Sequence, residues 1–173
     1  MREIGGDVGE AIREAIKLEI VGRGHFTRAA ETTQNELGKK MFRQLAQDEV
    51  SHLKTFKELI SSVVGGEDWK EQVDEDELKF ESSLIDELAL KVEEEERKGE
   101  LGPIRIGMEL ERRAIDFFEG WAEKTDDPTA KEIFRRIAEE EKKHYDLLQA
   151  QYDYVTNSGY WFDIAEFQMD GKY

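Results

Sequence analysis

The chain has 173 residues, of which 38% are charged, and its 41 acidic residues against 25 basic ones give a formal net charge of −16. This length predicts one domain with a substantial core, and the acidic excess argues against a nucleic-acid partner, because phosphates are bound by clustered lysine and arginine. The absence of cysteine excludes disulfides, thiolate metal sites and cysteine nucleophiles.

The sequence does not predict a membrane or secretory protein. No apolar run approaches the roughly 18 residues that a membrane-spanning helix needs, and the residues from Met1 to Gly6 do not resemble a signal peptide. We therefore expect a cytoplasmic protein with no membrane partner. The high content of charged residues, with only two prolines, favours a chain that is helical throughout.

The first part of the chain predicts an antiparallel helix hairpin. Apolar residues recur every three or four positions from Asp7 to about Thr32, which predicts a helix with a candidate capping box at its start. A second helix is expected from Leu37 to about Val63, where two glycines follow and end it. The polar connection at residues 33–36 is so short that the two helices must be antiparallel.

Residues from about 67 to 102 join this hairpin to a second one and include a predicted amphipathic crossover helix. The third helix begins near Pro103, and Asp127-Pro128 predicts a cap and the first position of a fourth helix that ends near Gly159. The expected fold is an all-α four-helix bundle over residues 1–157. The tail at 158–173 is aromatic, and we expect it to pack over one end of the bundle or onto a partner chain.

The two hairpins carry the same polar pattern. Glu19 precedes Glu49 and His52 in the first, and Glu111 precedes Glu141 and His144 in the second; each lone glutamate stands 30 residues before its Glu-x-x-His (49 − 19 and 141 − 111). An offset of 92 residues (141 − 49) relates the two sets without a gap. The same offset aligns further identical residues, among them Phe26/Phe118, Thr33/Thr125, Lys39/Lys131 and Phe42/Phe134. Such a repeat indicates that a two-helix unit was duplicated.

The repeated glutamates lie in apolar stripes, where the burial of a lone carboxylate would cost several kcal/mol and four together would repel one another. Two divalent cations would balance their charge. Residues i and i+3 share a helix face, and one Glu from each of two helices with Glu-x-x-His from each of the other two is the ligand pattern of di-iron or di-manganese bundles. Carboxylate and imidazole suit Fe(II) or Mn(II) better than a structural zinc site, although zinc stays an alternative ion. The expected metal ligands are Glu19, Glu49, His52, Glu111, Glu141 and His144.

Over about residues 7–157 the sequence resembles the rubrerythrin branch of the ferritin-like superfamily. The resemblance is carried by Glu19, Leu45-Ala46-Gln47-Asp48-Glu49-Val50-Ser51-His52, Glu111 and Ile137-Ala138-Glu139-Glu140-Glu141-Lys142-Lys143-His144. It implies a ferritin-like fold in which Glu49 and Glu141 bridge two iron ions. Glu19 with His52 and Glu111 with His144 would be terminal ligands, and which histidine serves which iron is left open. It also implies reaction with hydrogen peroxide or dioxygen, as in a response to oxidative stress.

The sequence differs from that family in three respects. Ala114 stands where rubrerythrins carry an extra glutamate one turn along the third helix, and Phe26 and Phe118 stand where a tyrosine is common. A Cys-x-x-Cys rubredoxin module is also absent, because the chain has no cysteine. Electrons would therefore come from an external redox protein such as a rubredoxin.

We expect a non-haem di-iron oxidoreductase that reduces hydrogen peroxide or dioxygen. A ferroxidase that oxidises Fe(II) and a non-catalytic helical scaffold stabilised by zinc or manganese are the alternatives. A homodimer is expected, and the long crossover allows hairpins to be exchanged between chains.

Other polar and aromatic residues are not assigned to the site. His25 lies six residues after Glu19, about 240° around the helix, so we expect it to point away from the cluster, at the surface or in a contact between chains. Glu139 and Glu140 are expected in solvent, because only Glu141 is in phase with His144. Trp121 follows the core phase poorly and is expected at a dimer interface.

Overall fold

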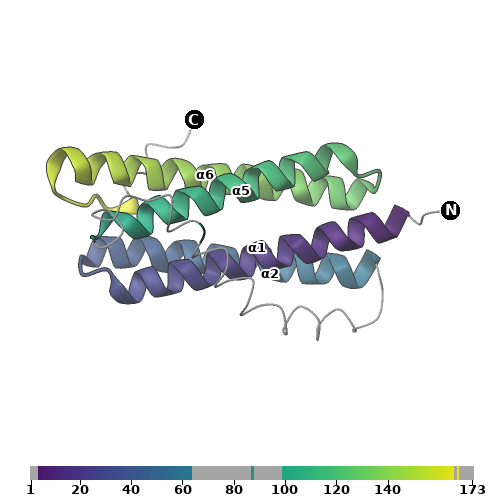
Figure 1. Ribbon diagram of the computed structural model, residues 1–173, viewed down its shortest axis with the longest axis horizontal. Coiled ribbons are helices and arrows are strands. Elements are labelled where there is room, and N and C mark those ends of the chain that lie inside the picture. Colours follow the sequence, from purple (N-terminus) through teal and green to yellow (C-terminus); the bar gives the residue numbers. More distant parts are fainter. Residues whose placement is uncertain (1–3, 64–86, 88–98, 166, 168–173) are drawn as a thin grey trace.

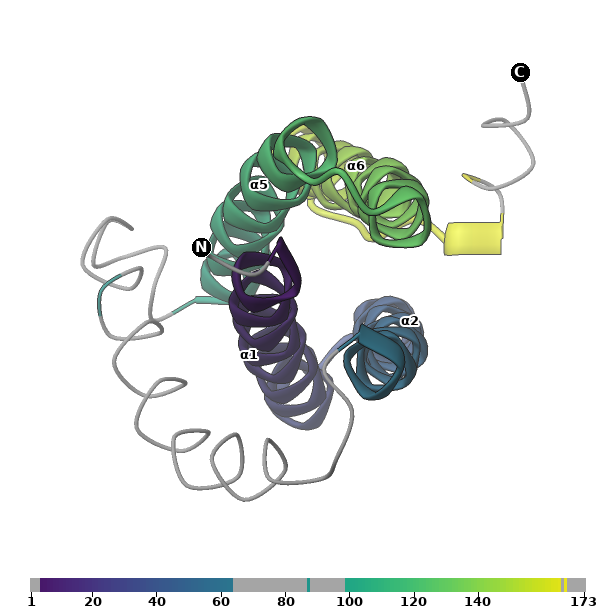
Figure 2. The same cartoon turned by 90° about the vertical axis from the view of Figure 1, so that its right-hand side faces the viewer.

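The computed structural model describes residues 4–63, 87, 99–165 and 167, and these residues form four long helices in two antiparallel hairpins (Figure 1). Helix α1 (Ile4–Thr32) pairs with α2 (Glu36–Val63), and α5 (Leu101–Lys124) pairs with α6 (Pro128–Ser158). Between the hairpins α1 packs against α5, whereas α2 and α6 make the sparser contact (Figure 2). The predicted all-α four-helix bundle is confirmed. The predicted crossover helix falls almost entirely outside the described residues, and none of the described helices is long and apolar enough to cross a membrane.

Side-chain caps begin two of the helices. At the start of α2, Asn35 Oδ1 accepts hydrogen bonds from the backbone N–H groups of Leu37 at 2.9 Å and Gly38 at 3.3 Å. At the start of α6, Asp127 Oδ1 accepts the N–H of Ala130 at 2.8 Å. Each cap satisfies N–H groups that have no partner inside the first helical turn. The cap predicted at Asp127 is confirmed.

Both ends of α6 lie where the sequence predicts them, but the start of α1 does not. Pro128 is the first residue of α6, where its missing N–H costs nothing. The helix ends at Gly159, whose φ of 79° lies in the left-handed region that glycine enters without steric penalty. The end predicted near Gly159 is therefore confirmed. The capping box predicted at Asp7 is wrong, because α1 is already helical from Ile4.

The two hairpin turns are built in the same way. The backbone N–H of Thr33 donates to Ala29 O, and that of Thr125 donates to Trp121 O, both at 2.9 Å. A lysine from the following helix then bonds the end of the preceding one: Lys39 Nζ donates to Ala30 O at 3.2 Å and Lys131 Nζ to Ala122 O at 2.7 Å. These contacts satisfy carbonyls that lack a partner at a helix C-terminus. They explain why the same threonine and lysine occur in both halves.

The apolar core is divided into two clusters. One contains Phe56, Phe118 and Phe134, with the Phe118 and Phe134 ring centroids 6.1 Å apart. The other contains Phe26 and Phe42, with ring centroids 6.3 Å apart. The members of each repeated phenylalanine pair thus lie in opposite clusters, as expected if a two-fold axis relates the hairpins. Along α2, α5 and α6, the repeated glutamates and histidines fall between residues of one cluster and residues of the other; in α1, Glu19 lies near the end of the stretch that belongs to the first cluster.

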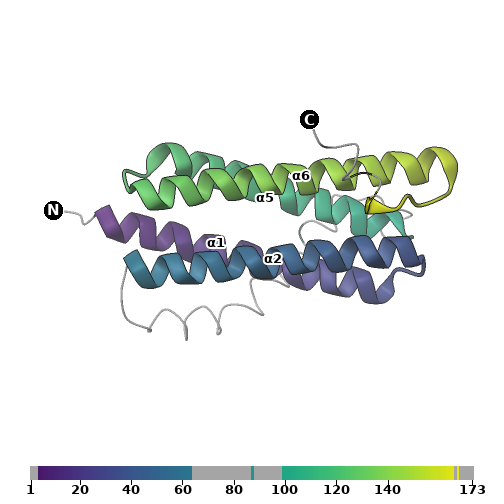
Figure 3. The same ribbon diagram turned by 180° about the vertical axis from the view of Figure 1, so that it is seen from behind.

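The described part of the C-terminal tail covers one end of the bundle. Figure 3 shows it folding back from the end of α6 between α6 and α2. Trp161 is buried and lies edge-on to Phe42, with ring centroids 6.4 Å apart. The side chain of Gln151 accepts the N–H of Phe162 at 3.0 Å and donates to its carbonyl at 3.1 Å. The prediction that the tail packs over one end of the bundle is confirmed for these residues.

Trp121, expected at a dimer interface, is partly buried against the cluster around Phe118. The ammonium group of Lys124 lies 5.5 Å from the centre of its ring. Contacts within its own chain therefore cover part of the Trp121 side chain. Its contact with a second chain stays a prediction.

Candidate metal centre

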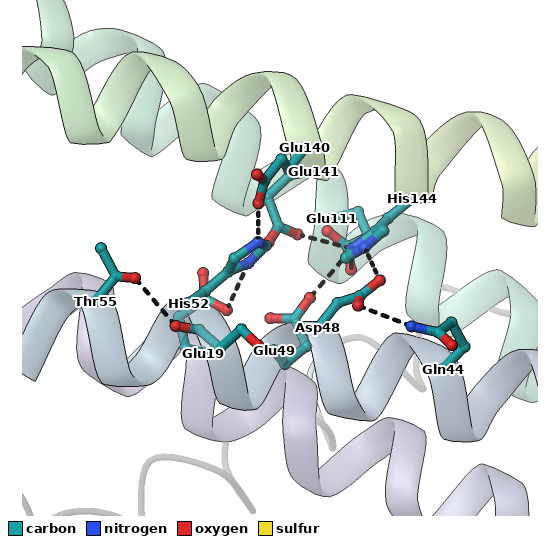
Figure 4. Close-up of polar contacts among 11 residues, drawn as sticks. Glu19, Gln44, Asp48, Glu49, His52, Thr55, Glu111, Glu140, Glu141 and His144 are labelled. Carbon is teal, nitrogen blue, oxygen red and sulfur yellow. Dashed lines mark hydrogen bonds and ion pairs between the residues drawn. The ribbon is translucent and has the colours of Figure 1, made fainter. Parts of the chain in front are cut away.

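The six residues of the repeated pattern converge in the middle of the bundle (Figure 4). One glutamate comes from α1, one from α5, and a glutamate and a histidine come from each of α2 and α6. All six are buried, with exposed fractions between 1% and 7%: Glu19, Glu49, His52, Glu111, Glu141 and His144. Four carboxylates and two imidazoles thus share one interior site, and their role as ligands stays a prediction.

The side-chain atoms form two groups that share two carboxylates. One oxygen or nitrogen atom from each of Glu19, Glu49, His52 and Glu141 lies within 4.8 Å of the others. The same is true when Glu111 and His144 replace Glu19 and His52. Glu49 and Glu141 therefore belong to both groups, which is the arrangement expected of two carboxylates between a pair of ions.

Hydrogen bonding inside this cluster is incomplete. His52 Nδ1 and Glu141 Oε1 lie 2.6 Å apart, but without the geometry of a hydrogen bond. Each of the six side chains has a buried atom with no hydrogen-bond partner: Glu19 Oε2, Glu49 Oε1, His52 Nδ1, Glu111 Oε2, Glu141 Oε1 and His144 Nδ1. Leaving a buried polar group unsatisfied costs about 1–3 kcal/mol. A divalent cation removes this cost, because it binds several of these atoms at once, so the residues present fit a metal.

The pKa values of the carboxylates in the metal-free site shift in different directions. Burial, followed by the charges of Glu49 and Glu141, raises the pKa of Glu19 well above its ordinary value. Burial and the charge of Glu141 also raise the pKa of Glu49. Burial acts on Glu141 as well, but its contacts with the two histidines outweigh burial and lower its pKa to about 2. Without a cation, protons bound to side chains of the cluster neutralise part of the negative charge of its carboxylates.

The pKa values of the two histidines are raised, whereas burial lowers the pKa of most buried histidines. Burial lowers the pKa of His52, but its contacts with Glu141 outweigh burial and raise it to about 9. Burial lowers the pKa of His144 as well, but its hydrogen bond to Asp48 and its contacts with Glu141 and Glu49 outweigh burial and raise the pKa well above 6.5. The two rings stack, with centroids 5.8 Å apart. Their Nδ1 atoms lie among the buried carboxylates, 3.4 Å from Glu19 for His52 and 3.4 Å from Glu49 for His144.

Two further carboxylates contact the outer edges of these rings. Asp48 Oδ2 lies 3.0 Å from His144 Nε2, and Glu140 Oε2 lies 2.5 Å from His52 Nε2. Glu139 is exposed as predicted, but the prediction that Glu140 lies only in solvent is wrong, because His52 reaches it from the other hairpin. Burial raises the pKa of Asp48, but the hydrogen bond from His144 outweighs it and the net shift is downward. A sequence signal was present, since an acidic residue precedes each Glu-x-x-His at the same offset.

His25 is directed away from the cluster, but the prediction of a surface position is wrong. It is 7% exposed, and its Nε2 lies 2.9 Å from Pro103 O at the start of α5. Burial lowers its pKa to about 4. The first turn of α5 covers this side of α1, and a helical wheel of α1 alone does not contain that information.

Gly22 is a second residue that the sequence did not identify. A Cβ atom at this position would lie 3.0 Å from Glu49 Oε2 and 3.2 Å from Glu49 Cδ. A side chain here would be in tight contact with the carboxylate, so the Glu49 side chain would have to shift by a few tenths of an ångström. The glycine therefore contributes to the position of one of the two shared glutamates.

A cavity of about 580 Å³ opens between α2 and α6 beside the cluster. Its lining includes both histidines together with Asp48, Glu140 and Lys143. The glutamates of the cluster are at most 3% exposed. Solvent therefore approaches the site from the histidine side.

Comparison with known proteins places this arrangement in a family. The Rubrerythrin family model matches residues 10–152, which include parts of all four helices and all six clustered residues. The structure of a hypothetical protein from Pyrococcus furiosus is similar with a TM-score of 0.64, at 22% identity over 87% of this chain and 90% of that chain; this likeness supports the fold alone. No curated protein matches the chain significantly. Because the family model spans most of the sequence, the chain belongs to the rubrerythrin family.

Proposed function

We propose that the chain is a di-iron oxidoreductase that reduces hydrogen peroxide, or dioxygen, with electrons from an external redox protein. The observation that carries this proposal is the pair of buried four-residue groups that share Glu49 and Glu141. Glu19 and His52 would complete the ligands of one ion, and Glu111 and His144 those of the other. Carboxylate and imidazole ligands of this kind suit Fe(II).

Two ferrous ions would supply the two electrons that, with two protons, convert hydrogen peroxide into two water molecules. The chain supplies binding and electrostatics. Its four buried glutamates would balance the charge of two divalent ions, and Glu49 and Glu141, which belong to both groups, would contribute to holding both. The apolar clusters around Phe118 and Phe26 flank the site, and a hydrophobic shell of this kind limits the access of water to bound metal.

An external electron donor is part of the proposal. These 173 residues contain no cysteine, so none of them can form a rubredoxin-type iron site that would deliver electrons. A separate redox protein such as a rubredoxin would fill this role, and we propose a homodimer as the working form.

The test begins with the metal content of protein purified without added metal. The protein is then reduced without oxygen and mixed rapidly with peroxide or with dioxygen while its near-ultraviolet and visible absorption is followed. We expect about two irons per chain and faster oxidation by peroxide than by dioxygen. Continued turnover of excess Fe(II) would instead identify a ferroxidase. Zinc, or iron that responds to neither oxidant, would contradict an oxidoreductase and favour a scaffold.

A further inference from the structure

The cavity between α2 and α6 is much larger than hydrogen peroxide requires. Its volume is about 580 Å³, whereas a water molecule occupies about 30 Å³ in the liquid and pockets for organic ligands measure about 300–1,000 Å³. His52 and His144 form part of its wall, so the cavity adjoins the proposed metal pair. It therefore has room for a substrate that carries an organic group.

The polar and apolar residues of the lining lie at different levels of the cavity. Asp48 contacts His144 where α2 and α6 run past each other in opposite directions (Figure 1). Leu45 lies three residues before Asp48 (48 − 45), and Leu147 lies three residues after His144 (147 − 144), so both leucines line the cavity one turn nearer the C-terminal tail. Both belong to a buried apolar cluster, and Phe167 of the tail packs against that cluster and lines the cavity as well. The cavity thus has a polar end at the histidines and an apolar end at the tail.

The charged residues of the lining favour a neutral ligand. Asp48 and Glu140 contribute two carboxylates. Among the described residues of the lining, Lys143 alone carries a permanent positive charge, and it is exposed to solvent. Like charges brought together in a binding site disfavour the wrong ligand. An anionic ligand is therefore disfavoured relative to a neutral one of the same shape.

We propose that this cavity binds a neutral organic hydroperoxide, with the hydroperoxy group at the histidine end and the organic group against Leu45, Leu147 and Phe167. This inference rests on the proposed function and names its substrate class. Two electrons from the ferrous pair and two protons break the O–O bond, the irons become ferric, and the products are one alcohol and one water molecule. Burial of the organic group at the apolar end supplies binding free energy that hydrogen peroxide cannot obtain.

Binding is tested without turnover. Isothermal titration of the protein with its metal as purified uses 2-phenyl-2-propanol, the alcohol formed from cumene hydroperoxide. Leu147→Phe fills the apolar end, and Phe167→Ala removes part of its wall. The matched control is Val50→Phe, because Val50 is 49% exposed and does not line the cavity. We expect affinity for the alcohol to fall about 10-fold or more in Leu147→Phe, to fall in Phe167→Ala, and to stay unchanged in Val50→Phe.

The substrate class is tested by rapid mixing of the reduced, iron-loaded protein with three oxidants: hydrogen peroxide, cumene hydroperoxide and the para-carboxylate derivative of cumene hydroperoxide. The neutral organic hydroperoxide should oxidise the iron faster than its carboxylate derivative. The ratio of the rate constants for cumene hydroperoxide and hydrogen peroxide should fall about 10-fold in Leu147→Phe and stay unchanged in Val50→Phe.

The outcomes separate this inference from the proposed function. Iron that is oxidised by hydrogen peroxide but not by cumene hydroperoxide overturns this inference alone, as does equal affinity for the alcohol in the wild type and Leu147→Phe. Equal rates for the neutral and the carboxylate hydroperoxide overturn the neutral class. Iron that responds to no peroxide and not to dioxygen overturns both proposals. If Leu147→Phe does not fold, Phe167→Ala, which changes only the tail, decides the same comparisons.

Discussion

The metal-free protein should become less stable as the pH rises from 6.5 to 9. The pKa of His52 is raised from 6.5 to about 9 in the folded metal-free chain. Between these values the folded state holds a proton that the unfolded state lacks, so the free energy of unfolding falls by about 1.4 kcal/mol per pH unit. Over the difference of about 2.5 units (9 − 6.5), the loss is about 3 kcal/mol. This stabilisation is fully present below pH 6.5 and is lost as the pH passes through 9.

Other groups do not cancel this slope. The raised pKa values of His144, Glu19 and Glu49 act in the same direction. Glu141 has a lowered pKa of about 2, so its contribution changes only under acidic conditions. His25, whose pKa is lowered to about 4, is neutral in both states over most of this pH range and adds little.

Urea unfolding followed by circular dichroism at several pH values between 6.5 and 9 measures this effect. The metal-free protein should lose stability across the range, and metal-free His52→Gln should lose less. In the metal-bound protein the slope should be absent or reversed, because cations replace the protons and compete with them at low pH. A free energy of unfolding that stays constant or rises in the metal-free wild type would refute the reasoning.

Three substitutions test other parts of the structure. Glu49→Ala should abolish most metal binding because Glu49 belongs to both groups, whereas Glu19→Ala should retain roughly half of the metal. Elemental analysis measures the metal content, and equal content in the two variants would contradict the shared role of Glu49. Gly22→Ala places a Cβ 3.0 Å from Glu49 Oε2 and should weaken Mn(II) binding. The control is Gly120→Ala, whose Cβ would have nothing within 4 Å. It should leave Mn(II) binding intact and raise the free energy of unfolding by about 0.5–1 kcal/mol, as measured by thermal melts. Asp127→Ala removes the cap of α6 and should lower the free energy of unfolding by about 1 kcal/mol with unchanged metal content; an unchanged urea midpoint would show that the cap is dispensable.

The helices and the convergence of the six polar residues were predictable because both depend on spacing along single helices. Apolar residues recur every third or fourth position along each helix, and a glutamate at one position of such a stripe must enter the core with it. Two such hairpins that pack through their apolar faces must bring Glu19, Glu49, Glu111 and Glu141 together. The cap at Asp127 was predictable for a related reason, since it depends only on neighbours in sequence.

The features that were missed depend on contacts between helices. The burial of His25 requires the first turn of α5 over α1, and the contact of Glu140 with His52 requires α2 beside α6. A helical wheel places Glu140 toward solvent because it treats α6 in isolation. The sequence contains a related signal, because Asp48 occupies the equivalent position in the first hairpin. This signal predicts a contact with the histidines only when the two hairpins are known to pack about a two-fold axis.

The near two-fold relation of the hairpins bears on how such a site can evolve. Two separate copies of one hairpin in an isologous dimer would contain every residue type of the cluster. In that dimer each substitution would appear twice and would change both ion positions alike. A single chain with both hairpins is free of this constraint, and its halves have already diverged: Gly22 corresponds to Ala114, and Asp48 corresponds to Glu140. The two proposed ion positions would therefore be chemically distinct, and the chain could favour a different metal at each, which a symmetric dimer could not do.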